Sequence, residues 1–276
     1  QIGPIAGVTI STPDLGKAEA VYASYLGYRV LSYESVSADQ ARLWRTPGAE
    51  GRRCLRMAPA AADDFVFRFI EMPAEPGYRA FSRHGWNAAE LIVASVDALA
   101  QRLASSPFEI VAPPMDLSFC PDIRAMQVRG PGGEILYLTE FKKPVPGLEA
   151  PPARCEVDRT FIVIAGGASL DAMQDFYATR FAVPRAPALE SRVQTMALEF
   201  GLSREHRFRI AALPLGGRCY IEADEMPAAA QPLPAEQYEL PPGIAIVSFL
   251  GAPQAGMDSI SCIRGAAGEI LEIIPR

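Results

Sequence analysis

The chain repeats itself, and this duplication constrains its fold more than any other feature. Arg129–Leu138 (RGPGGEILYL) and Arg264–Ile273 (RGAAGEILEI) are identical at six of ten positions, 135 residues apart. The tetrapeptide EMPA stands at Glu71–Ala74 and again at Glu225–Ala228. Matches that recur in one order along a chain indicate a structural unit that is used more than once.

A third match supports the same division of the chain. Ala20–Leu26 and Asp175–Phe181 share a Tyr-Ala pair at an offset of 155 residues. We therefore predict two similar halves, residues 1–143 and 153–276. The proline-rich segment 144–152 would join them as a linker.

Each half divides again into two units with the order β-α-β-β-β. In the first unit, apolar spacing predicts a strand at Val8–Ser11 and a helix at Leu15–Leu26, which Gly27 ends. The remaining strands of this unit are predicted at Arg29–Tyr33, Ala41–Trp44 and Phe65–Glu71. This alternation of elements predicts an α+β fold.

The other units follow the first with one exception. Helices are predicted at Val96–Ala104 in the second unit and Leu170–Phe181 in the third. The glycine-rich Gly130–Gly133 lies between two strand-like runs and is predicted to be a hairpin turn. In the fourth unit, Gly251–Gly256 replaces the helix and the strand that should follow Ile244–Leu250.

Composition narrows the classes of partner. With 26 basic and 32 acidic residues the net charge is −6, and no Lys/Arg run occurs, so nucleic acid is a poor candidate. The apolar runs fall short of the ~20 residues that a membrane span needs. No retained secretory signal opens the chain, and Gln1 is not an initiator, so we expect that residues before it were removed or lie outside this sequence. Five widely spaced cysteines without a C-x-x-C motif predict free thiols and a cytoplasmic location.

A motif at the start of the chain carries a family resemblance. Val8–Tyr28 reads Val-x-Ile-x-x-Pro-Asp-Leu…Tyr-x-x-x-Leu-Gly-Tyr, and with the paired βαβββ units it resembles the vicinal oxygen chelate superfamily. That superfamily includes glyoxalase I, extradiol dioxygenases and bleomycin-resistance proteins. The resemblance covers nearly the whole chain and implies two tandem domains, each a curled mixed sheet around a pocket with helices outside.

The resemblance also implies a divalent metal, bound by a histidine in each first strand and a glutamate in each last strand. The histidine positions fall at or near Gly7, Ala88, Ile162 and Ala245, and the glutamate positions at Arg68, Tyr137, Glu222 and Glu272. Because no histidine position is filled, we predict no metal cofactor. A divalent metal is the alternative, with Glu222 and Glu272 as its only candidate ligands.

Four of these positions are expected to lie in two cavities. Arg68 and Tyr137 would face an N-terminal cavity, where Arg68 binds either Glu90 or an anionic or carbonyl group of a ligand. Glu222 and Glu272 would face a C-terminal cavity. There they could form a catalytic pair or bind neighbouring arginines.

Two residues near the N-terminal cavity are candidates for acid-base chemistry. His84, one of two histidines, precedes the first strand of the second unit and is either a general acid/base or an ordinary loop residue. Glu90 stands in an otherwise apolar strand and needs a partner there. The candidate ligand contacts are Arg68, Trp86, Phe119, Arg124 and Tyr137. The alternative for Arg124 is a surface ion pair with Asp122.

These observations favour recognition of a small apolar or aromatic molecule, carboxylated or not, in the N-terminal cavity. A metal-independent lyase or isomerase using His84 or Glu90 is the favoured enzyme class. A non-catalytic binding or resistance protein is one alternative, and a metal-dependent dioxygenase or glyoxalase-like lyase is another. The expected partner is a small molecule rather than nucleic acid or a membrane, and a homodimer stays open.

Overall fold

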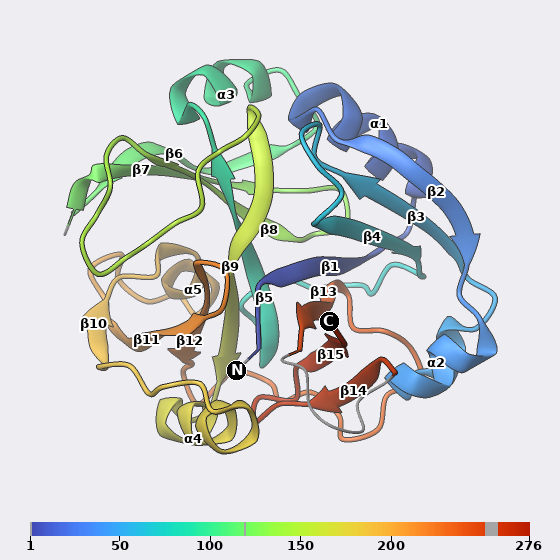
Figure 1. The fold of residues 1–276 in the computed structure, drawn as a ribbon. Helices are drawn as coiled ribbons and strands as arrows, with labels where there is room; N and C mark the ends of the chain where they lie inside the picture. Colours follow the sequence, from blue (N-terminus) through green and yellow to red (C-terminus); the bar gives the residue numbers. More distant parts are fainter. Residues whose placement is uncertain (1, 119, 252–258) are drawn as a thin grey trace.

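The computed structural model describes residues 2–118, 120–251 and 259–276. Its strands form a seven-stranded sheet, with the order β14-β15-β13-β1-β4-β3-β2, and an eight-stranded sheet, with the order β10-β11-β12-β9-β5-β8-β7-β6. Both sheets contain parallel and antiparallel neighbours. The predicted α+β class, with curled mixed sheets and peripheral helices, is confirmed (Figure 1).

The four units are recognisable in the element order. Unit one contains β1 (Ile5–Thr12), α1 (Leu15–Leu26), β2 (Arg29–Ser35), α2 (Ala38–Trp44), the 3-10 turn η1 (Pro47–Ala49), β3 (Arg53–Ala58) and β4 (Val66–Glu71). Unit two contains β5 (Gly85–Val93), α3 (Val96–Leu103), β6 (Glu109–Leu117), β7 (Cys120–Arg129) and β8 (Ile135–Phe141).

The second half repeats this order with a shorter end. Unit three contains β9 (Val157–Gly167), α4 (Leu170–Phe181), β10 (Leu189–Ser191), α5 (Gln194–Glu199), β11 (Phe208–Leu215) and β12 (Cys219–Glu225). Unit four contains β13 (Gly243–Leu250), β14 (Ser261–Arg264) and β15 (Ile270–Ile274). The predicted glycine-rich replacement at 251–256 lies, apart from Gly251, outside the described residues.

The pairing of the units differs from the expected one. β1 pairs with β13, so units one and four share the seven-stranded sheet, and β5 pairs with β9, so units two and three share the eight-stranded sheet. We expected units one and two to share a cavity, and the topology corrects this. A sequence repeat shows that units are alike, but it carries no information on which strand edges meet.

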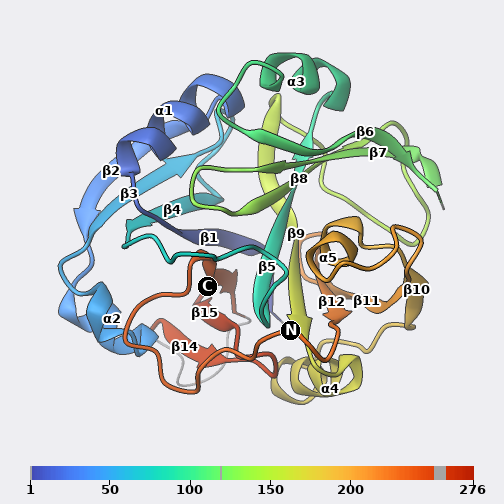
Figure 2. The same ribbon diagram turned by 180° about the vertical axis from the view of Figure 1, so that it is seen from behind.

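The outer helices are set by local capping. Asp14 accepts a hydrogen bond from Lys17 N at 2.9 Å to begin α1, and Gly27, with φ of 70°, ends it in the left-handed conformation that glycine adopts without strain. Ser95 and Ser169 cap α3 and α4 in the same way. α1, α3 and α4 lie at the periphery, while β1, β13, β5 and β9 run through the middle of the molecule (Figure 1, Figure 2).

One continuous core joins the convex faces of both sheets. It includes Phe67 and Val247 of the seven-stranded sheet together with Leu136 and Ile221 of the eight-stranded sheet, all of which are buried. The face of each sheet opposite this core is called its concave face below. No described helix is long and apolar enough to cross a membrane, and the five cysteines are free thiols as predicted.

Two short helices cover the concave faces, and the sequence reading missed both. α2 occupies the predicted strand Ala41–Trp44, because Ser37 and Gln40 form a reciprocal capping box that begins a helix there. Its Trp44 packs against Ile246 and Ile270 of the seven-stranded sheet. α5 holds the corresponding place in unit three and packs on the eight-stranded sheet.

A buried tyrosine–glutamate hydrogen bond recurs in each half. Tyr22 in α1 donates to Glu134 Oε1 at 2.8 Å, and Tyr177 in α4 donates to Glu269 Oε1 at 2.6 Å. Each carboxylate also accepts a backbone N–H, from Gly132 or from Ala267, at 2.8 Å. The repeated Tyr-Ala and Gly-Glu-Ile-Leu sequences are thus the two ends of one contact, and this contact joins the two sheets within each half.

Candidate functional site

The concave face of the seven-stranded sheet contains a buried ion pair. Arg68 in β4 lies 3.2 Å from Glu272 Oε2 in β15, and their side chains are 15% and 5% exposed. Arg68 also donates from Nε to Thr9 Oγ1 at 2.8 Å, and its guanidinium lies 4.7 Å from the ring centroid of Trp44. These two residues occupy the positions where the resemblance implies metal-binding glutamates.

Glu272 has every partner that a buried carboxylate requires. Ser248 Oγ donates to it at 2.6 Å and Trp44 Nε1 at 2.9 Å, in addition to Arg68. Burial acts to raise the pKa of Glu272, but the charge of Arg68 and these hydrogen bonds outweigh burial and lower it. The network is closed, and a guanidinium in it repels a metal ion, so these residues do not fit the metal that the fold implies.

This arrangement corrects two expectations. Arg68 does not pair with Glu90, which lies in the other sheet, and Glu222 and Glu272 do not form a catalytic pair, because they also lie in different sheets. Both corrections follow from the pairing of unit one with unit four.

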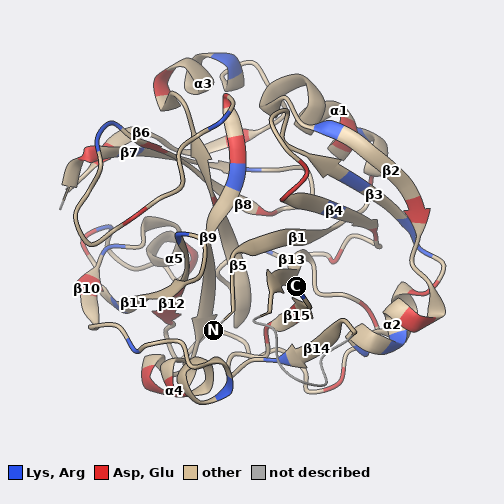
Figure 3. Cartoon of the chain, viewed as in Figure 1, with Lys and Arg blue, Asp and Glu red and all other residues tan. Residues whose placement is uncertain are grey.

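The concave face of the eight-stranded sheet holds acidic groups without a described basic partner. Glu90 in β5 is the register partner of Tyr137 in β8, and Glu222 and Asp224 follow each other on the same face of β12. On the outer helices and loops, acidic and basic residues are interspersed (Figure 3). No ion pair involves any of these three carboxyl groups within residues 2–118, 120–251 and 259–276.

The residues of this face, called the acidic face below, differ in their exposure to solvent. Glu90, Tyr137 and Glu222 are half-buried, whereas Asp224 is 0% exposed. Neither carboxyl oxygen of Asp224 has a hydrogen-bond partner among the described residues. A buried carboxylate without partners is costly, so Asp224 either is protonated or requires a partner that the described residues do not supply.

Burial dominates the acid-base properties of these residues. It raises the pKa of Glu90 to about 7 and the pKa of Asp224 to about 8. For Glu222, burial and then the neighbouring charges of Asp224 and Glu90 raise the pKa well above its usual range. Near neutral pH the acidic face therefore takes up and releases protons.

α5 covers the acidic face with one polar and several apolar contacts. Thr195 Oγ1 donates to Gln127 Oε1 of β7 at 2.5 Å. Met196 packs against Ala88 and Ile164, so the face has an apolar surround. Ala212, opposite Glu222 in the neighbouring strand β11, is half-buried and has a small side chain.

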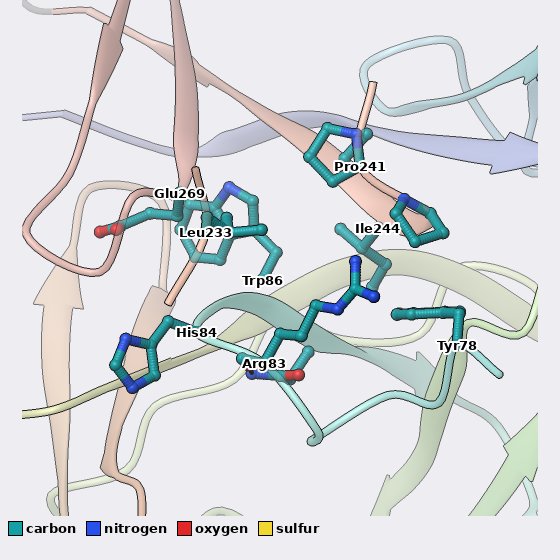
Figure 4. A pocket seen from close by; sticks show the side chains of 11 residues that line it. Tyr78, Arg83, His84, Trp86, Leu233, Pro241, Ile244 and Glu269 are labelled. Atoms are coloured by element: carbon teal, nitrogen blue, oxygen red, sulfur yellow. Dashed lines mark hydrogen bonds between the residues drawn. The ribbon is translucent and has the colours of Figure 1, made fainter. Parts of the chain in front are cut away.

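His84 lies elsewhere, at a small pocket beside Trp86 (Figure 4). The pocket has a volume of about 20 Å³, which is room for about one water. His84 turns its ring away from the side where Tyr78 and Ile244 lie, and burial lowers its pKa. Six strand residues, or ~20 Å, separate His84 from Glu90, so the two predicted acid-base residues do not share a site.

The remaining predicted contacts are not brought to the acidic face. Trp86 is buried in the core and donates its indole N–H to Ile270 O at 2.8 Å. Arg124 points to the outer side, where it pairs with Asp97 and Asp116, each at 2.9 Å, rather than with Asp122. Phe119 lies outside the described residues. Of the predicted residues that the structure describes, Glu90, Tyr137 and Glu222 meet on the acidic face, whereas Arg68 and Glu272 meet on the concave face of the seven-stranded sheet.

Three residues of the acidic face were missed from the sequence. Asp224 follows Glu222 at an interval of two residues in CYIEADE, and this period places both on one face of a strand, so the signal was present. In β7, Gln127 alternates with residues that belong to the core, so the same period of two places Gln127 on the concave face. Thr195 carries no such signal, because α5 was not expected.

A second hollow lies between residues 72–76 and 233–242, with a volume of about 340 Å³. Its walls include the ion pair of Arg83 with Glu75 and the exposed Tyr238. The hydroxyl of Ser11 at its edge is buried and lacks a partner within the described chain. Its lining includes five prolines and the acidic residues Glu75, Glu236 and Glu239, and none of the described residues predicted for the site lies in it.

No protein-family model matches the chain, and no curated protein is significantly similar to it in sequence. Solved structures are similar over its whole length. Glyoxalase I from Zea mays is 11% identical, with a TM-score of 0.62 over 98% of this chain and 92% of that one. A putative dioxygenase from Bacillus subtilis is 11% identical, with a TM-score of 0.63 over 100% and 86% of the two chains. The predicted vicinal-oxygen-chelate fold is confirmed, and at this identity the likeness concerns the fold alone.

Replacing Arg68 by methionine should destabilise the protein by about 3–5 kcal/mol, because Glu272 would be left buried and without its cation. Arg68→Met/Glu272→Gln should recover much of this loss, since the coupling between paired residues is removed. Urea unfolding of both variants measures the effect. Arg124→Met is the surface control and should cost about 1 kcal/mol or less. A loss for Arg68→Met no larger than for this control would contradict the ion pair.

The protein should be less stable at pH 8.5 than at pH 5.5. Glu90 and Asp224 have folded-state pKa values of about 7 and 8, above the value of about 4 in an unfolded chain. The folded state therefore binds more protons in this window, and stability falls as pH rises through it. Carboxyl groups with lowered pKa, such as Glu272, titrate below this window. Burial lowers the pKa of His84, so this residue makes a small contribution by which stability rises with pH.

Urea unfolding at pH 5.5, 7.0 and 8.5 tests this expectation. Asp224→Asn should increase stability at pH 8.5 by about 1–3 kcal/mol and reduce the pH dependence. Glu109→Gln, on the outer surface, should leave the pH dependence as it is. A stability that rises from pH 5.5 to 8.5 would contradict the burial of these carboxyl groups.

Proposed function

We propose that the chain binds a small organic molecule on the acidic face of the eight-stranded sheet, without a metal. The observation that carries this proposal is the contrast between the two concave faces. On the seven-stranded sheet the polar groups satisfy one another, whereas on the eight-stranded sheet Asp224 has no described partner. A site whose polar groups lack internal partners is suited to a ligand that supplies them.

The residues of this face suit an organic ligand better than a metal ion. Glu90 and Glu222 are half-buried and accessible, and Tyr137 and Ala212 offer aromatic and apolar contact beside them. No described group of three or more His, Cys, Asp or Glu residues has the arrangement of a metal site. Transition metals prefer imidazole or thiolate ligands, and this face contains neither.

Filling the acidic face should abolish binding. We expect Ala212→Phe to place a ring opposite Glu222 and to weaken every ligand of this face at least tenfold. The matched control is Ser32→Phe, which adds the same ring to the concave side of the seven-stranded sheet, in the row of Arg56 and Arg68. This control should leave binding unchanged.

The measurement is ligand-observed NMR with a library of small amines, alcohols and ketones, in the presence of EDTA. The proposal requires binders that Ala212→Phe weakens and Ser32→Phe does not. It is overturned if no member of the library binds, if both variants behave alike, or if EDTA removes binding.

We propose proton transfer by Glu90 as the second candidate function. A pKa of about 7 lets Glu90 accept a proton from the carbon next to a carbonyl group at neutral pH. The resulting enolate oxygen would receive hydrogen bonds from the phenol of Tyr137 and from protonated Glu222. For a β,γ-unsaturated ketone, return of the proton from Glu90 to the γ-carbon of the dienolate moves the carbon–carbon double bond into conjugation with the carbonyl group, so atoms and charges balance without a metal.

This second function predicts exchange of carbon-bound protons in D₂O. The wild-type protein should catalyse exchange next to the carbonyl group of ketones from the library, and Glu90→Gln should reduce the rate at least 100-fold. Proton NMR follows the exchange, and Glu109→Gln is the matched surface control. Exchange that Glu90→Gln does not slow, or no exchange with the wild type, would contradict a role of Glu90 as base.

A further inference from the structure

The two sheets place different residues at equivalent positions, and the difference concerns one positive charge. In the seven-stranded sheet, Glu272 of the last unit meets Arg68 of the first. The repeats place Glu222 of unit three at the position of Arg68, and Tyr137 of unit two at the position of Glu272. The seven-stranded sheet therefore sets a guanidinium opposite a carboxylate, whereas the eight-stranded sheet sets a carboxyl group opposite a phenol and has no guanidinium at either position.

We infer that the ligand of the acidic face carries a protonated amine or guanidinium group, which binds Glu222 and Asp224 and supplies the positive charge that Arg68 supplies in the other sheet. This inference rests on the proposed binding function and names the chemical class of its ligand. The fully buried Asp224, unpartnered within the described chain, is the independent observation that points to a missing group.

No described basic residue on the surrounding elements can supply that charge, because each one has another partner. Arg129 of β7 pairs with Glu109, Arg159 of β9 with Asp64, and Arg209 of β11 with Asp171 and Glu225; Arg124 of β7 pairs with Asp97 and Asp116. β5, β8, β12 and α5 contain no Lys, Arg or His. The groups that titrate on this face are therefore Glu90, Tyr137, Glu222 and Asp224.

The two concave faces also resemble each other in having an aromatic ring beside the acidic residue. Arg68 lies over the ring of Trp44 next to Glu272. A ligand cation beside Glu222 would lie next to the ring of Tyr137. Burial, and then the charge of Glu222, raise the pKa of Tyr137, so its phenol stays neutral. A cation between a carboxylate and an aromatic face is stabilised by both.

Binding of such a cation is linked to proton release. Burial raises the pKa of Asp224 to about 8, so a positive ligand must displace a proton at neutral pH. The affinity for a cation should therefore rise with pH between 6 and 8, while the affinity for an uncharged molecule of the same shape should not. The second candidate function needs deprotonated Glu90 together with protonated Glu222, so its rate should instead pass through a maximum as pH rises.

Benzylamine and benzyl alcohol are the probes, because they match in shape and differ in charge. Isothermal titration at pH 6.0, 7.0 and 8.0 in EDTA should show benzylamine binding at least tenfold tighter than benzyl alcohol at pH 8.0. Its affinity should increase at least fivefold from pH 6.0 to 8.0, with proton release visible as a dependence of the heat on the buffer.

Two variants separate this role from a structural one. Asp224→Asn should weaken benzylamine at least tenfold while raising the melting temperature, since it removes an unpartnered buried acid. Tyr137→Arg supplies the cation of the other sheet and should abolish benzylamine binding. The control Glu50→Gln, at an exposed glutamate without an ion pair among the described residues, should change neither measurement.

The inference is overturned if benzylamine binds no tighter than benzyl alcohol at every pH, or if neither binds. It is also overturned if Asp224→Asn leaves benzylamine affinity unchanged. The failure of the proposed function is distinguishable, because benzyl alcohol or another library member that Ala212→Phe blocks would preserve small-molecule binding while the charge requirement fails.

Discussion

The arrangement of the four units depends on a buried hydrogen bond that the chain makes twice. Tyr22 with Glu134, and Tyr177 with Glu269, each join the helix of one unit to the hairpin turn of the next. Burial raises the pKa of both glutamates, yet each also accepts a backbone N–H, so neither is left without partners. Because each bond links the two sheets, it holds a half together even though that half forms no sheet of its own.

The two concave faces are different solutions to the same electrostatic problem. A carboxyl group that leaves water must lose its charge or find a cation. Glu272 keeps its charge, because Arg68, Ser248 and Trp44 replace the lost water. Glu222 and Asp224 lack such partners within the described residues, and burial raises their pKa values instead. The concave face of the seven-stranded sheet therefore contributes to stability. The acidic face keeps polar groups that a ligand can bind, and it does so at a cost in stability.

Local structure was predictable from the sequence, but contacts distant in the chain were not. Leu15–Leu26 and Leu170–Phe181 are helices with the predicted bounds, because caps and apolar spacing are local signals. The helix α2 was wrongly predicted as a strand. Its capping box at Ser37 and Gln40 is a local signal that was missed, and the burial of its Trp44 comes from strands of the fourth unit. The fold resemblance of Val8–Tyr28 is confirmed. The pairing of Arg68 with Glu272 joins residues 204 positions apart, so no local sequence pattern could predict it.

The pairing of units decides where a ligand can bind, since it determines which charges meet. With units one and two together, Arg68 would face Tyr137, and Glu222 would face Glu272. One face would then hold Arg68 with Glu90 as its candidate partner, and the other would hold two repelling acids. The observed pairing joins Arg68 to Glu272 and leaves Glu222 beside Tyr137. It neutralises one concave face within the chain and leaves Glu90, Glu222 and Asp224 without a described basic partner on the other. A duplicated scaffold can thus divide its two sheets between stability and binding through strand pairing alone, while each unit keeps the same local fold.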